Sequence, residues 1–114
     1  YQAIREEGER FGEETDTTFT AEAYYLSRAA PTDPRLQDLV ASAAEELGLS
    51  VLSMPSGAGH DAQSIAPLAP IGMIFVPSVS GISHSPLEFS HPQDIVAGAN
   101  VLLHTLLKLD ALDL

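Results

Sequence analysis

Two histidines flank one short apolar run in the second half of the chain. His60 lies in SGAGHDAQ, directly before Asp61, and His84 lies in GISHSPLE, beyond the run IGMIFVP. A neutral imidazole in a loop is a good ligand for zinc, manganese or cobalt. Glu88 follows His84 by four residues and could orient a metal-bound imidazole if the loop folds back, although a surface carboxylate would look the same in sequence. The pattern indicates a metal site.

A glycine-rich turn precedes the first of these histidines. Gly57 and Gly59 can adopt backbone angles closed to other residues, and successive N–H groups of such a turn can face an anion at a helix N-terminus. A purely structural turn between a strand and a helix explains the same letters. Asp61 could equally be a helix N-cap, and His60 could be hydrogen-bonded within the turn. This pattern does not distinguish an anion-binding site from a purely structural turn.

Other chemistries fit these residues less well. GISHS lacks the G-x-S-x-G pattern of a serine hydrolase, and the absence of cysteine excludes a thiolate nucleophile. A metal site usually needs about three or four protein ligands, so one histidine and a few carboxylates form an incomplete set. His91 adjoins the predicted helix cap Ser90, and His104 falls inside the last predicted helix. We expect neither of them to bind metal.

The first part of the chain predicts a helix followed by a strand. A thin apolar stripe begins at Tyr1, and Gly12 is placed to end that helix. Residues 17–26 alternate in the manner of a half-buried strand, with Tyr25 on its apolar side. The sequence AAPTDP then reads as a joint, which predicts a domain boundary near Ala30.

The remaining chain predicts an α/β fold. Asp33 can cap a helix that starts at Pro34 and stops at Gly48. Strands are predicted over residues 49–54 and 71–77, with a short helix over 61–67 between them and a long final helix whose cap, Ser90, has capping-box spacing to Gln93. This order favours a parallel pair joined by a crossover, with helices against the sheet and both histidine loops at the C-terminal edge. The predicted core is Leu36, Leu39, Val40, Leu47, Ile74, Phe75, Val76, Ile95, Val96, Leu103 and Leu106.

The composition and net charge of the chain exclude some classes of binding partner. The 114 residues are 45% hydrophobic and 18% charged, with 16 acidic and 5 basic residues and a formal charge of -11. Such a charge opposes nucleic acid and anionic lipid, and no apolar run is long enough to cross a membrane. We expect neither as a partner, and the cytoplasm is the default compartment. The chain opens at Tyr1 rather than Met, so we expect it to be part of a longer protein.

Taken together, SGAGHDAQ, GMIFVPS and GISHSPLE resemble the C-terminal end of the M20-type metal-dependent amidohydrolases. This group includes enzymes acting on N-carbamoyl amino acids, other ureido acids and allantoate. The resemblance implies that residues 1–30 end a lid or dimerisation domain and that residues 31–114 form the C-terminal part of a metal-binding catalytic domain. It also implies a homodimer, two divalent metal ions per site and a small ureido or carbamoyl substrate.

The same resemblance implies roles for particular residues. His84 would bind one of the two metal ions, and the backbone at Gly59 would hold the substrate carboxylate. His60, Asp61 and Glu88 would shape the site, while the general base and the other ligands would lie elsewhere in the protein. The intact enzyme would hydrolyse a C–N bond with a metal-activated water, and the 114-residue chain alone would be inactive. The alternatives are a stand-alone non-catalytic binding or dimerisation module and an M20-type peptidase or aminoacylase.

Overall fold

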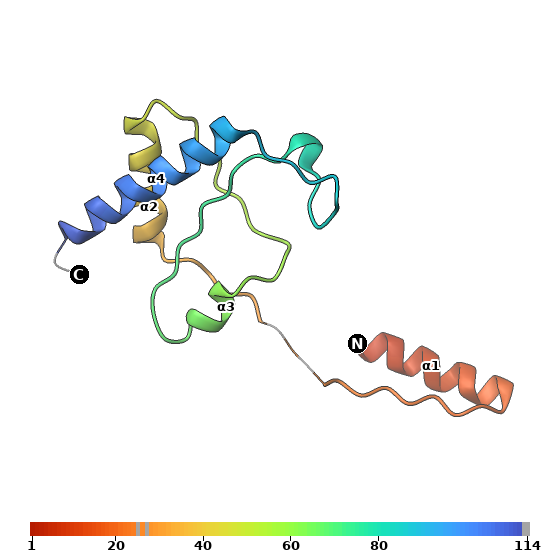
Figure 1. Cartoon of the computed structure of the whole chain (residues 1–114). Helices are drawn as coiled ribbons and strands as arrows, with labels where there is room; N and C mark the ends of the chain where they lie inside the picture. The colour runs from red at the N-terminus through yellow and green to blue at the C-terminus, as the bar shows by residue number, and fades with distance from the viewer. Residues whose placement is uncertain (25, 27, 113–114) are drawn as a thin grey trace.

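The computed structural model describes residues 1–24, 26 and 28–112. Helices joined by long non-helical segments make up this part of the chain (Figure 1). They are α1 (Gln2–Thr15), α2 (Pro34–Glu46), α3 (Ala62–Ile65), the 3-10 turn η1 (Val79–Gly81) and α4 (Pro92–Asp110). None of the helices in the described part is long and apolar enough to span a lipid bilayer.

The helix α1 continues past its predicted stop at Gly12 and is closed by Asp16, whose backbone is left-handed with φ 54°. Gly12 does not end the helix; it lets the chain at Thr17 approach the helix closely. A Cβ at Gly12 would lie 2.7 Å from the carbonyl oxygen of Thr17, so the missing side chain lets the following segment turn back against the helix. Phe19 then covers Gly8, where a Cβ would overlap its ring.

The segment after α1 runs back along the helix without forming a strand in its described residues. The Tyr1 hydroxyl donates a hydrogen bond of 3.0 Å to the carbonyl oxygen of Ala21, which holds the segment beside the start of α1. Tyr25, assigned to the apolar side of the predicted strand, lies outside the described residues. The helix and this segment therefore form a small hairpin-like unit at the N-terminal end of the chain (Figure 1).

The second helix has the ends that its sequence predicts. The Asp33 side chain accepts a hydrogen bond from the backbone N–H of Arg35, and Pro34 occupies the first helical turn, where its missing N–H costs nothing. Gly48 follows the helix with φ 70°, a left-handed conformation that favours glycine. Capping residues thus fix both ends of α2.

The packed core lies where α2 meets α4, which are the only described helices that contact each other. Ala43, Ala44 and Val101 are buried at this contact, and small side chains at the first two positions let the helices approach closely. Thr105 is buried one turn further along α4 and donates its hydroxyl to the Val101 carbonyl oxygen at 2.7 Å. At the far end of the contact, the Lys108 ammonium reaches the Glu46 carboxylate at 2.6 Å.

The predicted second strand, residues 71–77, lies against this helix pair. Its first carbonyl, that of Ile71, accepts a hydrogen bond of 2.8 Å from the N–H of Asp33 at the start of α2. Further along, Val76 packs where Gly98 of α4 lacks a side chain, and a Cβ on Gly98 would overlap it. The segment therefore packs against α2 and α4, whereas the prediction placed it in a sheet and buried it on both faces.

A sheet is absent from the described residues, so the predicted strands and their parallel pairing are not formed there. Residues 49–54 and 71–77 are non-helical, but no backbone hydrogen bond of the described chain joins them. A strand is stabilised by a ladder to a neighbour, and an apolar run without a neighbour has no ladder to join. The helical layer is thus present without the sheet that it was predicted to cover.

The predicted core is partly buried in and near α2 and wrong for all four predicted residues on α4. Partial burial is seen for Leu36, Leu39, Val40, Leu47, Ile74 and Val76. More than half of the side chain is exposed for Phe75, Ile95, Val96, Leu103 and Leu106. Since α4 contacts a single helix, only the stripe through Val101 and Thr105 is covered, and its remaining apolar residues face outward.

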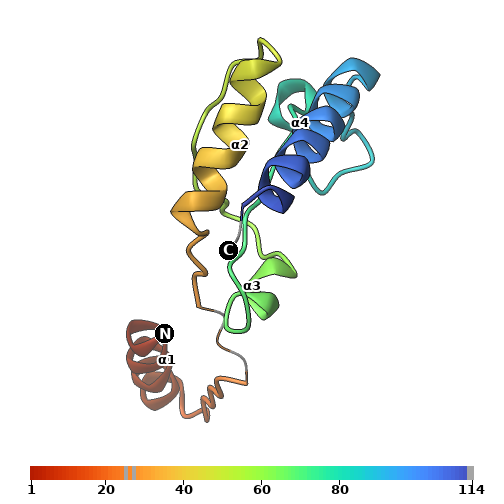
Figure 2. The same cartoon turned by 90° about the vertical axis from the view of Figure 1, so that its left-hand side faces the viewer.

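The chain is far less compact than its length allows. Its Cα radius of gyration is 20.8 Å and its extents are 65 × 37 × 18 Å. A compact domain of this length would have a radius near ~13 Å. Figure 2 shows why: the unit containing α1 lies apart from the body that contains α2 and α4.

Candidate functional site

The glycine-rich turn is organised around Ser56. Its Oγ lies 2.9 Å from Nε2 of His60, and the same oxygen is 3.2 Å from both the N–H and the carbonyl oxygen of Ala58. The His60 ring also meets the edge of the Phe75 ring, with centroids 5.5 Å apart and planes at 65°. The imidazole is therefore held by the turn on one side and by the apolar segment on the other.

The backbone of this turn is fixed by Gln63. Its Oε1 accepts a hydrogen bond of 3.2 Å from the N–H of His60, and its Nε2 donates to the carbonyl oxygen of Arg28 at 2.9 Å. A Cβ on Gly59 would lie 3.2 Å from the same Oε1. Gly59 is thus needed for close approach of a side chain, and a larger residue would displace Gln63.

Two expectations about the turn need correction. Neither Gly57 nor Gly59 is among the positive-φ glycines, so neither needs a special backbone angle; a Cβ on Gly57 would meet open space, and of the two only Gly59 has a close neighbour. Asp61 does precede α3, but its side chain makes no capping hydrogen bond, because its own backbone is already helical and not in the extended conformation of an N-cap. The prediction that His60 is hydrogen-bonded within the turn is confirmed by its bond to Ser56.

His84 lies in a loop closed upon itself. The N–H of Val79 donates to the carbonyl oxygen of Phe89 at 2.8 Å, which ties the two ends of the loop together. Ser78 Oγ donates to the carbonyl oxygen of Ile82 at 2.6 Å. His84 itself is exposed and has φ 55°, a left-handed conformation that non-glycine residues rarely adopt.

Glu88 supports this conformation, though not through the imidazole. Its Oε2 accepts a hydrogen bond of 2.8 Å from the backbone N–H of His84. The loop does fold back as expected, but the carboxylate engages the main chain rather than the ring. A residue in the left-handed region is strained by roughly 1–3 kcal/mol, and such strain persists only where surrounding contacts impose it. Glu88 supplies one of those contacts.

The other two histidines have structural positions. His91 is the N-cap residue of α4, so the helix begins one residue later than the predicted cap at Ser90 implied. Pro92 accounts for the difference, because proline favours the first helical position. The His91 ring contacts the edge of the Phe89 ring at 5.4 Å (ring centroids), and His104 lies half-buried within α4.

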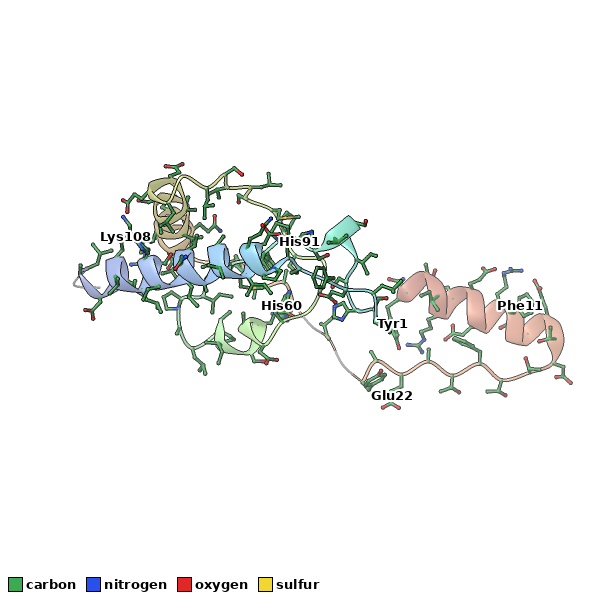
Figure 3. All side chains as sticks on the ribbon, turned by 45° about the horizontal axis from the view of Figure 1, so that its top comes forward. Tyr1, Phe11, Glu22, His60, His91 and Lys108 are labelled. Atoms are coloured by element: carbon green, nitrogen blue, oxygen red, sulfur yellow. The ribbon has the colours of Figure 1, made fainter. Side chains whose placement is uncertain are left out.

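The two histidine loops both adjoin the apolar segment of residues 71–77. His60 contacts Phe75, and the loop that carries His84 begins three residues later at Ser78. In Figure 3, His60 and His91 both lie in the body around α4, whereas Phe11 lies on the separate helix α1. No hydrogen bond or ring contact of the described residues joins the two loops, so one shared site stays a prediction.

The described residues do not complete a metal site. Among them, no group of three or more His, Asp or Glu side chains could hold an ion. His84 is exposed and could provide one ligand, while the Glu88 carboxylate is engaged by the main chain. The described residues thus offer the exposed imidazole of His84 and no complete set of ligands.

Comparison with known proteins places the chain in a family. The model of peptidase family M20/M25/M40 matches residues 5–108. The N-carbamoyl-L-amino acid amidohydrolase of Geobacillus stearothermophilus is 41% identical over 113 residues, which is 96% of this chain and 27% of that protein. The allantoate amidohydrolase of Escherichia coli strain K12 is 35% identical over 97 residues, covering 85% of this chain and 24% of that protein.

A solved structure gives the same result. A Burkholderia cenocepacia protein described as an amidohydrolase/peptidase superimposes with a TM-score of 0.69 at 44% identity, over 94% of this chain and 26% of that one. The chain belongs to peptidase family M20/M25/M40. It spans about a quarter of the length of these relatives.

Sequence reasoning missed the residues that hold the turn together. The sequence pattern assigns no role to Ser56 or Gln63 and does not predict the contact of His60 with Phe75. A hydroxyl four residues before a histidine, within a turn of small residues, is the signal that could have identified Ser56. Nothing local in the sequence points to the bond between Gln63 and Arg28, because those residues are far apart along the chain.

Proposed function

We propose that this chain is the C-terminal portion of a metal-dependent amidohydrolase that cleaves the C–N bond of N-carbamoyl amino acids or related ureido acids such as allantoate. The observation that carries the proposal is the 41% identity to an N-carbamoyl-L-amino acid amidohydrolase over 96% of this chain. The match to an allantoate amidohydrolase supports the same substrate class.

The shape of the chain supports its being one portion of a longer protein. Its radius of gyration exceeds that of a compact domain, and large apolar side chains on α1 and α4 are exposed. The rest of the polypeptide would cover these surfaces and pair with residues 71–77. In this proposal, residues 1–30 end a lid or dimerisation domain of a cytoplasmic homodimer, and residues 31–114 complete the catalytic domain.

The residues of this chain would bind and position rather than carry out the chemical step. His84 would provide one metal ligand from its closed loop, and Glu88 would fix the main chain there. The backbone at Gly59 would receive the substrate carboxylate, with His60 and Asp61 beside it. A bound zinc, manganese or cobalt ion would supply an activated water. The other ligands and the general base would come from the rest of the protein.

The test uses the intact polypeptide and substitutions at two histidines. His84→Ala should remove most hydrolysis of an N-carbamoyl amino acid and lower the metal content, because a ligand is lost. His104→Ala, a change within α4, should leave both nearly unchanged. The 114-residue chain alone should retain no stoichiometric metal after dialysis and should release no ammonia. Normal turnover and metal content in the His84→Ala variant would contradict the proposal.

A peptidase or aminoacylase is the second candidate, favoured by the description of the Burkholderia relative as an amidohydrolase/peptidase. Dipeptides and N-acyl amino acids in the same assay separate the two: faster turnover of these substrates than of carbamoyl or ureido acids would favour the second candidate. A stand-alone binding or dimerisation module would instead show no hydrolysis of either class, even in the intact polypeptide with metal supplied.

A further inference from the structure

The hydrogen bonds around Ser56 bear on which nitrogen of His60 carries its proton. The hydroxyl has one hydrogen to donate and two lone pairs that accept. Its three neighbours are the Ala58 N–H, the Ala58 carbonyl oxygen and Nε2 of His60. The Ala58 N–H can only donate and the carbonyl can only accept, so the two possible tautomers of His60 satisfy these groups differently.

One tautomer satisfies every group. If the hydroxyl donates to the Ala58 carbonyl oxygen, its two lone pairs accept from the Ala58 N–H and from an N–H on Nε2 of His60. If Nε2 were unprotonated, the hydroxyl hydrogen would have to serve both the carbonyl oxygen and the ring nitrogen. The first arrangement therefore uses all three contacts of the hydroxyl, whereas the second leaves one of them without a proton.

We infer that Ser56 is a positioning residue that holds the neutral His60 imidazole with its proton on Nε2 and leaves Nδ1 as a hydrogen-bond acceptor. The edge contact with Phe75 and the bond from the His60 N–H to Gln63 fix the ring and its backbone in the same turn. The imidazole is thus held through its ring nitrogen, its ring edge and its main chain.

The Nδ1 acceptor has a chemical consequence for the ligand, which rests on the proposed function. His60 directly follows Gly59, whose backbone is proposed to receive the substrate carboxylate. A neutral acceptor at this position favours a ligand that carries an N–H donor close to its carboxylate. Carbamoyl and ureido derivatives of amino acids have such an N–H on the nitrogen next to the acid-bearing carbon. An ester of the same shape lacks this hydrogen and would leave Nδ1 without a partner.

The test follows the ring proton of His60 by long-range nitrogen–proton NMR, at a pH where the spectrum itself shows the ring to be neutral. The 114-residue chain should show the His60 proton on Nε2, slowed in its exchange with water by the bond to Ser56. Ser56→Ala should lose that slowed signal, and Ser56→Thr should restore it because the hydroxyl is kept. Ser53→Ala, an exposed serine in the same segment, is the matched control and should not change the signal.

A proton found on Nδ1 of the unsubstituted chain, or an unchanged signal in the Ser56→Ala variant, would overturn the inference. These readouts need no catalysis, so they decide about Ser56 even if the hydrolase proposal fails. In the intact polypeptide, Ser56→Ala should raise KM for a ureido acid about two- to tenfold, as for one weakened neutral hydrogen bond, with a smaller change in kcat. Equal KM values in the Ser56→Ala and Ser53→Ala variants would contradict the ligand-binding role.

Discussion

At the scale of single residues, the carboxylate of Glu88 acts on the main chain of the residue that is proposed to bind metal. It accepts from the N–H of His84, whose φ of 55° is otherwise unfavourable. The direction in which a side chain leaves the backbone depends on φ, so this bond fixes where the imidazole can point. Glu88 thus acts on His84 through its backbone N–H and not through its imidazole ring.

Replacement of Glu88 separates its charge from its hydrogen bond. Glu88→Ala should speed amide exchange at His84 and, in the intact polypeptide, weaken metal binding by about 10–100-fold, the usual cost of losing a group that orients a ligand. Glu88→Gln should keep most of the affinity because the amide oxygen still accepts. Exchange is measured by NMR and affinity by metal titration. Equal losses in both variants would show that the charge, and not the hydrogen bond, is what matters.

At the scale of elements, the sequence predicted what local interactions decide. Asp33, Pro34 and Gly48 set the ends of α2 through short-range rules, and these ends are correct. At α4 two local signals disagreed: Ser90 has capping-box spacing to Gln93, but Pro92 occupies the first turn and His91 is the N-cap.

Local sequence could not predict whether residues 71–77 form a strand, because a strand needs a neighbouring strand for its hydrogen-bond ladder. The Ser56 bond was missed for a related reason: it depends on how the turn folds.

The contact between α2 and α4 should weaken in acid. The hydrogen bond from Lys108 is the main cause that lowers the pKa of Glu46 below its ordinary value of 4.5. A lowered pKa in the folded state means that the contribution to stability is full above about pH 4.5 and is lost as pH falls through the folded-state pKa. Both groups face solvent, so the effect should be small.

Glu46→Gln tests this contribution. The variant should melt at a lower temperature than the unsubstituted chain at pH 7, and the difference should disappear as the pH falls through the lowered folded-state pKa of Glu46, because Glu46 becomes protonated. Thermal unfolding followed by circular dichroism measures it at both pH values. Glu45→Gln makes the same charge change on an exposed neighbour and should show less effect at pH 7. A difference between Glu46→Gln and the unsubstituted chain that persists in acid would assign the effect to packing.

At the scale of the whole molecule, the described structure is a helical layer and a distant helical unit without the sheet that would join them. The exposed apolar stripe of α4 and the long extents of the chain have the same cause: one packed contact, between α2 and α4, organises the described helices. In the proposed longer protein, neighbouring strands and helices would supply the missing contacts.

Hydrogen exchange tests whether residues 49–54 and 71–77 become strands in the longer protein. In the 114-residue chain, their amides should exchange rapidly, whereas amides near Val101 in α4 should be protected. In the intact polypeptide, both segments should gain protection comparable to that of α4, because ladder bonds would form. Continued rapid exchange of residues 71–77 there would contradict the α/β architecture, and protection in the short chain would show that it already finds a partner.

The unpaired segment at residues 71–77 also bears on the solution behaviour of the isolated chain. Apart from the Ile71 carbonyl, which Asp33 engages, this run of apolar, uncharged residues has no backbone hydrogen-bond partner among the described residues, and such a run is a template for fibrillar self-association. The formal charge of -11 at neutral pH opposes that process, because each added molecule brings further negative charge to the assembly. This repulsion vanishes near the isoelectric point of about 4.4, where aggregation of the chain should be fastest.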